Sequence, residues 1–300
     1  MDIILHLGAH KTASTYLQKR LSRSHGRLKR HQISFHGPKS LRPQINKALC
    51  NQRGLSMAEA GHRRQTCLAE LIYTEEAAGT KRLVLSEEQF LGSLREMVLG
   101  RDFYQDAPGR LDPIAKALGD RPVHLLLSVR GYANFLSSVY GQVIRGWRFM
   151  PFDQKLRDHF LNQTQGWPEL VELILGTFPS AHKITLWPFE DFAGVEHQIL
   201  THMAGPAVAE LKSVPNRPFS APSQTTIDWL HAQAAAGKPP DQDTVNAAYE
   251  TALKEHGHKP FDPWSVEERA YLDSRYRQDL IWLCRLTECT WLTADTEQAA

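Results

Sequence analysis

Short apolar segments alternate in this sequence with segments of helical periodicity, and no other feature limits the possible folds as strongly. The apolar segments are rich in Ile, Val and Leu, as buried strands are. Strands are expected at 3–7, 33–36, 82–86, 123–129 and 183–187. Helices are expected between them, at 12–30, 58–78, 109–118, 132–146, 151–164 and 168–177. The alternation predicts an α/β protein with three layers, in which helices cover both faces of a parallel sheet.

The pattern changes after about residue 205. Segment 205–224 contains four prolines and is expected to be a loop. Helices are then expected at 222–236, 241–256 and 265–287. We interpret residues 205–300 as a mostly helical extension packed on the same domain, so that residues 1–300 form one domain.

Composition excludes several classes of protein. Of the 300 residues, 42% are apolar and 23% are charged, as in an ordinary soluble chain. No run approaches the roughly 18 apolar residues of a membrane span, and the first residues lack the pattern of a secretory signal. The four cysteines form no CxxC pair, which is typical of reduced thiols in a cytoplasmic protein. The basic residues are not interleaved with aromatic residues, so no nucleic-acid partner is expected.

The first expected strand is followed at once by a segment suited to bind an anion. Gly8 permits a tight turn, and Lys11 with three hydroxyl residues precedes a helical pattern. The N-terminus of a helix offers free backbone N–H groups and the positive end of the helix dipole. Because ligands bind outside the carboxyl ends of parallel strands, this segment predicts a phosphate site.

The segment is not a standard Walker loop, which reads G-x-x-x-x-G-K-[ST]. Thr12 follows Lys11 as that motif requires, but Gly8 lies only three residues before Lys11 and no glycine directly precedes the lysine. No expected strand ends in an aspartate that would hold Mg²⁺, since Asp120 follows a helical segment. The sequence favours a phosphate ligand that is handled without a triphosphate–Mg²⁺ centre, and no metal is expected.

The segment from His10 to Leu17 resembles the 5′-phosphosulfate loop of sulfotransferases that use 3′-phosphoadenosine 5′-phosphosulfate. The likeness is closest to bacterial members whose loop reads H-K-T-G-T-T, although Ala13 replaces the usual glycine and Ser14 the first threonine. The resemblance implies a P-loop-type sheet and a donor held by Gly8, His10, Lys11, Thr12, Ala13, Ser14, Thr15 and Tyr16. In that family an aromatic ring after the loop lies against adenine, and Tyr16 holds this position; a buried core tyrosine is the alternative.

A second anion site is predicted where the strand 123–129 ends. Arg130 leaves the strand, and Ser138 lies two turns into the next expected helix. An arginine offers a planar fork suited to phosphate. The spacing of eight residues resembles the 3′-phosphate signature of the sulfotransferases, whereas Ser137 would face about 100° away on the helix. The alternative is an arginine paired with a surface acid and serines that merely permit close packing.

Weaker likenesses occur elsewhere, and none is recognised beyond residue 225. Residues 186–192 resemble a strand-end segment of the bacterial group, and residues 140–152 resemble the segment after its 3′-phosphate helix. Residues 216–220 resemble one of its loops.

Sulfuryl transfer is an in-line displacement, which resembles phosphoryl transfer and needs little covalent chemistry from the protein. Lys11 is a cation that can stabilise the negative charge that builds on the departing phosphate oxygen. A base must take the proton of the acceptor. By position, Glu87 resembles the histidine that cytosolic sulfotransferases carry at a strand end. Other members use a glutamate at the end of the second strand, where this chain has His36, and Glu88 is a third candidate.

We therefore expect a sulfotransferase that moves a sulfuryl group to a hydroxyl or amine acceptor, either a small molecule or a glycan. An atypical P-loop nucleotide kinase or nucleotide triphosphatase is one alternative. A non-catalytic nucleotide-binding protein of the same fold is another. Segments 37–60, 92–108 and 145–165 are expected to build the acceptor pocket, but no pattern identifies the acceptor.

Overall fold

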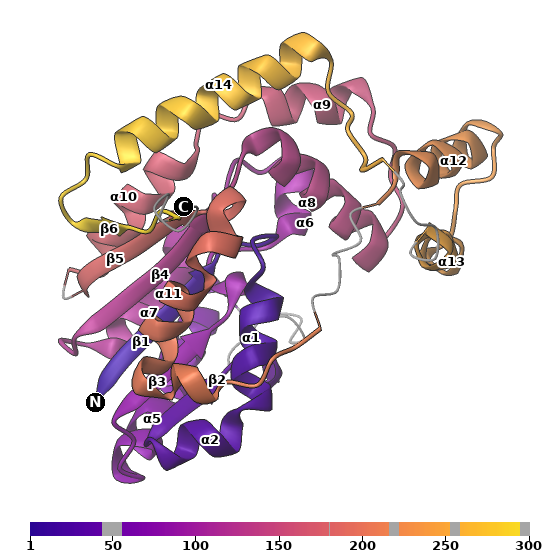
Figure 1. The fold of residues 1–300 in the computed structure, drawn as a ribbon. Helices are drawn as coiled ribbons and strands as arrows, with labels where there is room; N and C mark the ends of the chain where they lie inside the picture. Colours follow the sequence, from indigo (N-terminus) through magenta and orange to yellow (C-terminus); the bar gives the residue numbers. More distant parts are fainter. Residues whose placement is uncertain (44–55, 180, 216–221, 253–258, 295–300) are drawn as a thin grey trace, which may run out of the picture.

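The computed structural model describes residues 1–43, 56–179, 181–215, 222–252 and 259–294. Within them, one six-stranded sheet with only parallel pairings forms the centre of the molecule (Figure 1). The strand order is β2-β3-β1-β4-β5-β6. The strands are β1 (Asp2–Gly8), β2 (Ile33–His36), β3 (Arg82–Ser86), β4 (Val123–Val129), β5 (Ala181–Pro188) and β6 (Cys289–Trp291).

Five of these strands confirm the expected segments within two residues at each end, and β6 was not expected. The prediction of an α/β protein with a parallel sheet is likewise confirmed. The chain passes from β1 to the edge strand β2, returns as β3 beside β1, and then crosses to β4 on the other side of β1. The order therefore reverses around β1, and a crevice forms at such a point, outside the carboxyl ends of the strands.

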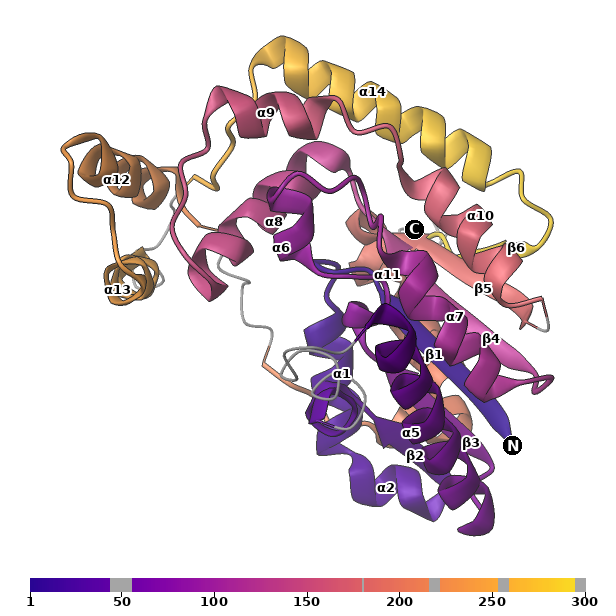
Figure 2. The ribbon, with the colours of Figure 1, turned by 180° about the vertical axis from the view of Figure 1, so that it is seen from behind.

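Helices cover both faces of the sheet because alternate strand residues are apolar on each side. In β1, Ile3, Leu5 and Leu7 belong to one buried cluster and Ile4 to the other. The first face is covered by α5 (Met57–Ala77), α7 (Ala107–Leu118), α8 (Tyr132–Gly146) and α10 (Trp167–Thr177) (Figure 2). The opposite face is covered by α1 (Ser14–Arg23), α2 (His25–Arg30) and α11 (Phe192–Ala204), seen in Figure 1.

The expected helices differ from the observed ones at a few places. The segment 12–30 is divided at Ser24 into α1 and α2, and α11 was not expected. Part of the expected loop 205–224 is the short 3₁₀ helix η4 (Gly205–Glu210). Further short elements are α3 (Pro38–Leu41), η2 (Glu88–Phe90), α6 (Leu94–Val98), α9 (Gln154–Leu161) and η3 (Phe189–Asp191).

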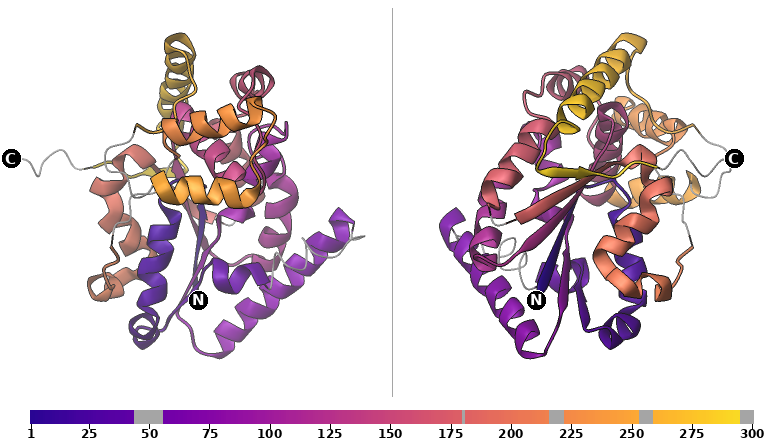
Figure 3. Two further views of the ribbon diagram at one scale, coloured as in Figure 1. Left: turned by 90° about the vertical axis from the view of Figure 1, so that its right-hand side faces the viewer. Right: turned by 60° about the vertical axis from the view of Figure 1, so that its left-hand side comes forward.

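The C-terminal part is mostly helical, as expected, but it also completes the sheet. Its helices are α12 (Gln224–Ala235), α13 (Gln242–Ala252) and α14 (Val266–Leu283), and the chain then adds β6 beside β5. Helix α14 contacts α8 and α10. Helices α12 and α13 lie on the side toward which the strands point (Figures 1 and 3), where Tyr249 donates a hydrogen bond to the Gly141 carbonyl at 2.7 Å. Among the described helices, none is both long and apolar enough to cross a membrane.

Candidate functional site

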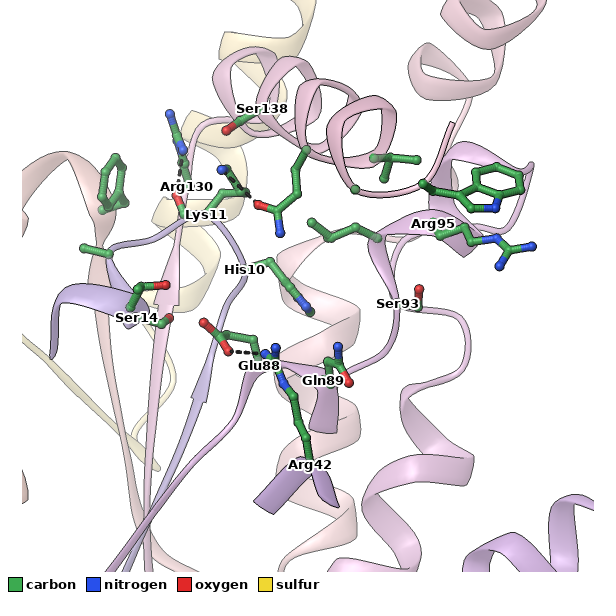
Figure 4. A pocket seen from close by; sticks show the side chains of 18 residues that line it. His10, Lys11, Ser14, Arg42, Glu88, Gln89, Ser93, Arg95, Arg130 and Ser138 are labelled. Carbon is green, nitrogen blue, oxygen red and sulfur yellow. Dashed lines mark hydrogen bonds and ion pairs between the residues drawn. The ribbon is translucent and has the colours of Figure 1, made fainter. Parts of the chain in front are cut away.

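A cavity of about 690 Å³ opens at the carboxyl ends of the central strands. The loop after β1 contributes His10 and Lys11, the segment after β3 contributes Glu88, and the segment after β4 contributes Arg130. These are the strands around which the order reverses, so the cavity lies where an α/β sheet is expected to bind its ligand. Figure 4 shows Arg130 and Ser138 on one side of the cavity and Ser93 and Arg95 on the other.

The loop between β1 and α1 is shaped by its own hydrogen bonds. The hydroxyls of Thr12 and Ser14 both donate to the Ala9 carbonyl, at 2.7 and 3.0 Å. Thr12 is fully buried by this contact, whereas Ser14 and Thr15 line the cavity. Gly8 has a φ of 103°, and a Cβ built there would lie 3.0 Å from Cγ of Glu88. Glycine is therefore required at the start of the loop. Because the Thr12 and Ser14 hydroxyls both donate their single proton to Ala9, Thr15 is the expected hydroxyl donor that is left for a ligand.

The N-terminus of α1 faces the cavity. Ala13 is the N-cap, adopts the left-handed conformation with φ 64°, and supplies no side-chain hydrogen bond to the helix. No acidic residue lies in the first turn of α1. Ala13, Ser14 and Thr15 all border the cavity, so the positive end of the helix lies beside it, as in sites that bind anions.

Lys11 is a largely buried cation. Its Nζ donates a hydrogen bond to Oε1 of Gln142 in α8 at 3.0 Å. Burial lowers the pKa of Lys11 from 10.5 to about 8, and the positive charges of Arg130 and Arg145 act in the same direction, while Glu88 opposes them. The amine is thus still protonated at neutral pH. A bound anion beside it would stabilise this charged form.

Arg130 lies beside the loop with part of its guanidinium uncommitted. One terminal nitrogen donates to the Lys11 carbonyl at 2.6 Å, and the guanidinium lies 4.6 Å from the ring centroid of Phe189. Its Nε is buried and has no hydrogen-bond partner among the described residues. Burial also lowers the pKa of Arg130 below its usual range. A buried donor without a partner is costly, and a bound anion would satisfy it.

Ser138 lines the same cavity as Arg130 and Lys11. Ser137, the neighbouring residue on α8, has a structural role instead. Its hydroxyl donates to the Ala133 carbonyl at 2.7 Å and accepts from Nε1 of Trp264 at 3.0 Å. The structure therefore places Arg130 and Ser138, which are eight residues apart in the sequence, on the same cavity.

The three candidate bases have different surroundings. Glu87 is fully buried, accepts two hydrogen bonds from Arg42 at 2.8 and 2.9 Å, and is not among the residues that line the cavity. His36 contacts Oε1 of Glu75 at 2.7 Å and also lies away from the cavity. Its strand β2 is at the edge of the sheet, with β3 between it and β1. Neither Glu87 nor His36, two of the three expected bases, therefore borders the cavity.

Glu88 is the candidate base that lines the cavity. Burial raises the pKa of its carboxyl, and the neighbouring Glu87 raises it further. Its Oε2 lies 3.4 Å from Nε2 of Gln18 and 3.6 Å from Nη2 of Arg42. Glu88 follows Glu87 at a strand end, where consecutive side chains point to opposite sides, so only one of the two can face the cavity.

His10 borders the cavity as an uncharged imidazole. Its backbone N–H and its Nδ1 both contact the hydroxyl of Tyr104, at 3.2 and 3.0 Å. Burial lowers the pKa of His10 to about 3, and Arg42 adds to the effect. We assign the Tyr104 hydroxyl as donor to Nδ1, since its oxygen already accepts from the backbone, and this leaves the proton on Nε2.

Two of the side chains expected to bind the donor do not line the cavity. One is the buried Thr12, and the other is Tyr16. Its hydroxyl donates to Glu196 at 2.9 Å, and its ring meets Phe192 edge-on at a centroid distance of 6.0 Å. It is not among the residues that line the cavity. The packing of this ring thus gives no support to our expectation that it contacts adenine, whereas Phe189 lines the cavity beside Arg130.

The side of the cavity away from Arg130 is polar and basic (Figure 4). It includes Arg42, Gln89, Ser93 and Arg95, and the Arg95 guanidinium lies 4.0 Å from the ring centroid of Trp147. Segments 37–60, 92–108 and 145–165, which are expected to build the acceptor pocket, each contribute residues to this cavity, although 44–55 lies outside the described residues. The loop at 216–220 lies outside them as well. Sequence reasoning did not single out Arg42, Arg95 or Trp147, and nothing in their local pattern marks them.

A smaller cavity of about 410 Å³ shares Lys11, Ser138 and Gln142 with the first. It extends to Asn246 and Tyr249 of α13, so the helical extension borders the site. In the part of the chain that the structure describes, no three His, Cys, Asp or Glu side chains gather as metal ligands would.

The fold and the site together define an α/β protein with a cavity at the carboxyl edge of a parallel sheet, lined by Lys11, Arg42, Arg95 and Arg130. The sequence matches no family model and no curated protein sequence. The function must therefore be argued from the geometry of the cavity.

Proposed function

We propose that this chain is a sulfotransferase of the P-loop fold, which transfers a sulfuryl group from 3′-phosphoadenosine 5′-phosphosulfate to a hydroxyl or amine acceptor. One observation carries the proposal. Lys11 and Arg130 are 119 residues apart in the sequence, yet they are in direct contact and border one cavity with Ser138. Two groups of anion ligands at neighbouring strand ends suit a nucleotide with phosphates on both the 5′ and 3′ positions.

The residues present fit such a donor. The N-terminus of α1, with Lys11, would hold the 5′-phosphosulfate. Arg130 and Ser138 would hold the 3′-phosphate, and the buried Nε of Arg130 would then gain a partner. The left-handed φ of Ala13 supports the resemblance further, because the family has glycine there and glycine adopts this conformation most easily.

Glu88 acts as the general base in this proposal. Its carboxylate takes the proton of the acceptor hydroxyl as the acceptor oxygen bonds to sulfur, and the bond between sulfur and the bridging phosphate oxygen breaks. Lys11 stabilises the negative charge that collects on the departing oxygen. The raised pKa of Glu88 suits this role, since a base is most effective when its pKa lies closer to the working pH.

His10 and Glu87 support the site without taking the proton. A histidine whose pKa is lowered to about 3 is a weak base, and its Nε2–H is a donor toward the cavity. Glu87 holds Arg42 through two hydrogen bonds and its charge raises the pKa of Glu88. In this arrangement the Glu88 carboxylate can meet an acceptor, whereas the Glu87 carboxylate is bonded to Arg42.

Binding and transfer measurements test the proposal. The wild-type protein is titrated with adenosine 3′,5′-bisphosphate and, separately, with ATP and Mg²⁺. We expect binding of the bisphosphate without added metal, and loss of sulfuryl transfer from the donor in Lys11→Ala. Tight Mg²⁺-dependent ATP binding with no affinity for the bisphosphate would instead indicate a kinase or nucleotide triphosphatase. Donor binding without transfer to a broad panel of alcohols, phenols, amines and glycans would indicate a non-catalytic protein.

A further inference from the structure

A carboxylate lies close to Arg130 but is not paired with it. Glu190 is in η3, directly after β5. One of its oxygens accepts a hydrogen bond from the backbone N–H of Gly131 at 3.0 Å. The other accepts from the hydroxyl of Tyr276, in α14, at 2.9 Å. Both oxygens are therefore engaged by groups other than the neighbouring guanidinium.

The position of Glu190 matters because an arginine paired with a carboxylate is less available to a phosphate. Glu190 is near enough that its charge partly offsets the effect of burial on the pKa of Arg130. The side chain of Glu190 is exposed and has rotational freedom, so only its hydrogen bonds hold it in place. Without the bond from Tyr276, one carboxylate oxygen would be released beside a buried guanidinium that has an unsatisfied Nε.

Tyr276 is itself held firmly. It is 8% exposed, and its ring meets Tyr132 edge-on at a centroid distance of 6.2 Å. Tyr132 in turn donates a hydrogen bond to Asp279 on α14 and accepts one from the backbone of Trp167 at 2.8 Å. The Tyr276 ring also packs tightly against the backbone at Gly131, because a Cβ built on Gly131 would lie 3.4 Å from that ring. The hydroxyl that restrains Glu190 is thus fixed by the packing of α14.

We propose that Tyr276 is a positioning residue that keeps Glu190 off Arg130 and so preserves the selectivity of the site for nucleotides with a 3′-phosphate. The inference rests on the proposed function, since Arg130 is the proposed 3′-phosphate ligand. It assigns to the C-terminal helix α14 a part in ligand selection, although α14 does not border the cavity.

Equilibrium binding of two ligands tests this role. Adenosine 3′,5′-bisphosphate and AMP differ only in the 3′-phosphate, and each is titrated calorimetrically into wild type, Tyr276→Phe and the double variant Tyr276→Phe/Glu190→Gln. In Tyr276→Phe we expect the affinity for the bisphosphate to fall about five- to tenfold, while the affinity for AMP changes less than about twofold. Tyr271→Phe, on the exposed side of the same helix, is the control and should leave both affinities unchanged.

The double variant separates positioning from packing. Glutamine cannot neutralise Arg130, so Glu190→Gln in the Tyr276→Phe background should restore most of the affinity for the bisphosphate. A purely structural role of Tyr276 would lower the affinities for both ligands and would not be rescued, and that result would overturn the inference. An unchanged preference for the bisphosphate in Tyr276→Phe would overturn it as well. A wild-type protein that binds the bisphosphate no better than AMP would instead refute the proposed donor site, and the inference with it.

Discussion

Replacement of Lys11 by methionine should make the ligand-free protein more stable while it slows the proposed sulfuryl transfer. Lysine and methionine are both unbranched, so the positive φ of 61° at this position affects them alike. The pKa of the Lys11 amine falls from 10.5 to about 8 in the folded protein. Because one pKa unit corresponds to about 1.4 kcal/mol, keeping this ammonium charged in the folded state costs about 3 kcal/mol below pH 8.

Methionine removes that cost and also removes the hydrogen bond to Gln142, which contributes about 1 kcal/mol. The expected net gain in the free energy of unfolding is therefore about 2 kcal/mol near neutral pH. The gain should depend on pH. The lowered pKa means that the unfolded chain binds more protons between about pH 8 and 10.5, so wild-type stability rises relative to the variant through that range.

Urea unfolding followed by tryptophan fluorescence measures both effects. Unfolding is recorded for wild type and Lys11→Met at about pH 7 and about pH 10, with Lys19→Met, an exposed lysine of α1, as the control. The control should change stability by less than about 0.5 kcal/mol. Lys11→Met should in addition lower kcat by about 10²–10³. A variant that is less stable than wild type near neutral pH, or whose advantage does not shrink toward high pH, would refute the reasoning.

Three further predictions concern the carboxylates and the pH dependence of the reaction. Glu88→Gln should lower kcat by about 10²–10⁴ with the affinity for adenosine 3′,5′-bisphosphate nearly unchanged, and an active variant would exclude Glu88 as the base. The profile of kcat/KM against pH should rise only above the usual range of a glutamate, because the pKa of Glu88 is raised, and fall above about pH 8 as Lys11 loses its proton; a flat profile would contradict both roles. Glu87→Gln should lower the free energy of unfolding by about 1–3 kcal/mol, since it weakens a buried carboxylate's bonds to Arg42, while nucleotide affinity measured by titration stays within about twofold of wild type.

The strands could be predicted closely because their signal is local. The run 123–129 is apolar except for His124 and Ser128, as is typical of parallel strands buried on both faces. The short strand β6 could not be predicted, because its three residues are only half-buried and its pairing with β5 depends on the path of α14. Helix α11 was not predicted although Asp191, a residue typical of helix starts, is its N-cap; the helix follows a 3₁₀ turn directly, and the Asp191 side chain makes no hydrogen bond to it.

The candidate site was predicted in part for a similar reason. Lys11 and Arg130 each follow a strand, and the carboxyl ends of parallel strands share one edge of the sheet. To choose between Glu87 and Glu88, one must know which of the two side chains faces the cavity after β3. The local sequence does not contain that information. The position of His36 away from the cavity could not be predicted, because strand order is a non-local property and β2 lies at the edge of the sheet.

The order of the strands also has a consequence for how the protein is made. Strand β1 pairs with β3 on one side and β4 on the other. Ile3 of β1, for example, lies opposite Leu83 of β3 and Val123 of β4. A ribosome must therefore synthesise more than a hundred further residues before the first strand gains both neighbours. Long-range pairing of this kind is slow to form and leaves strand edges open in the meantime. A nascent chain cannot form the proposed nucleotide site until α8 has emerged, near the midpoint of the 300 residues, so a ligand can promote folding only in the second half of synthesis.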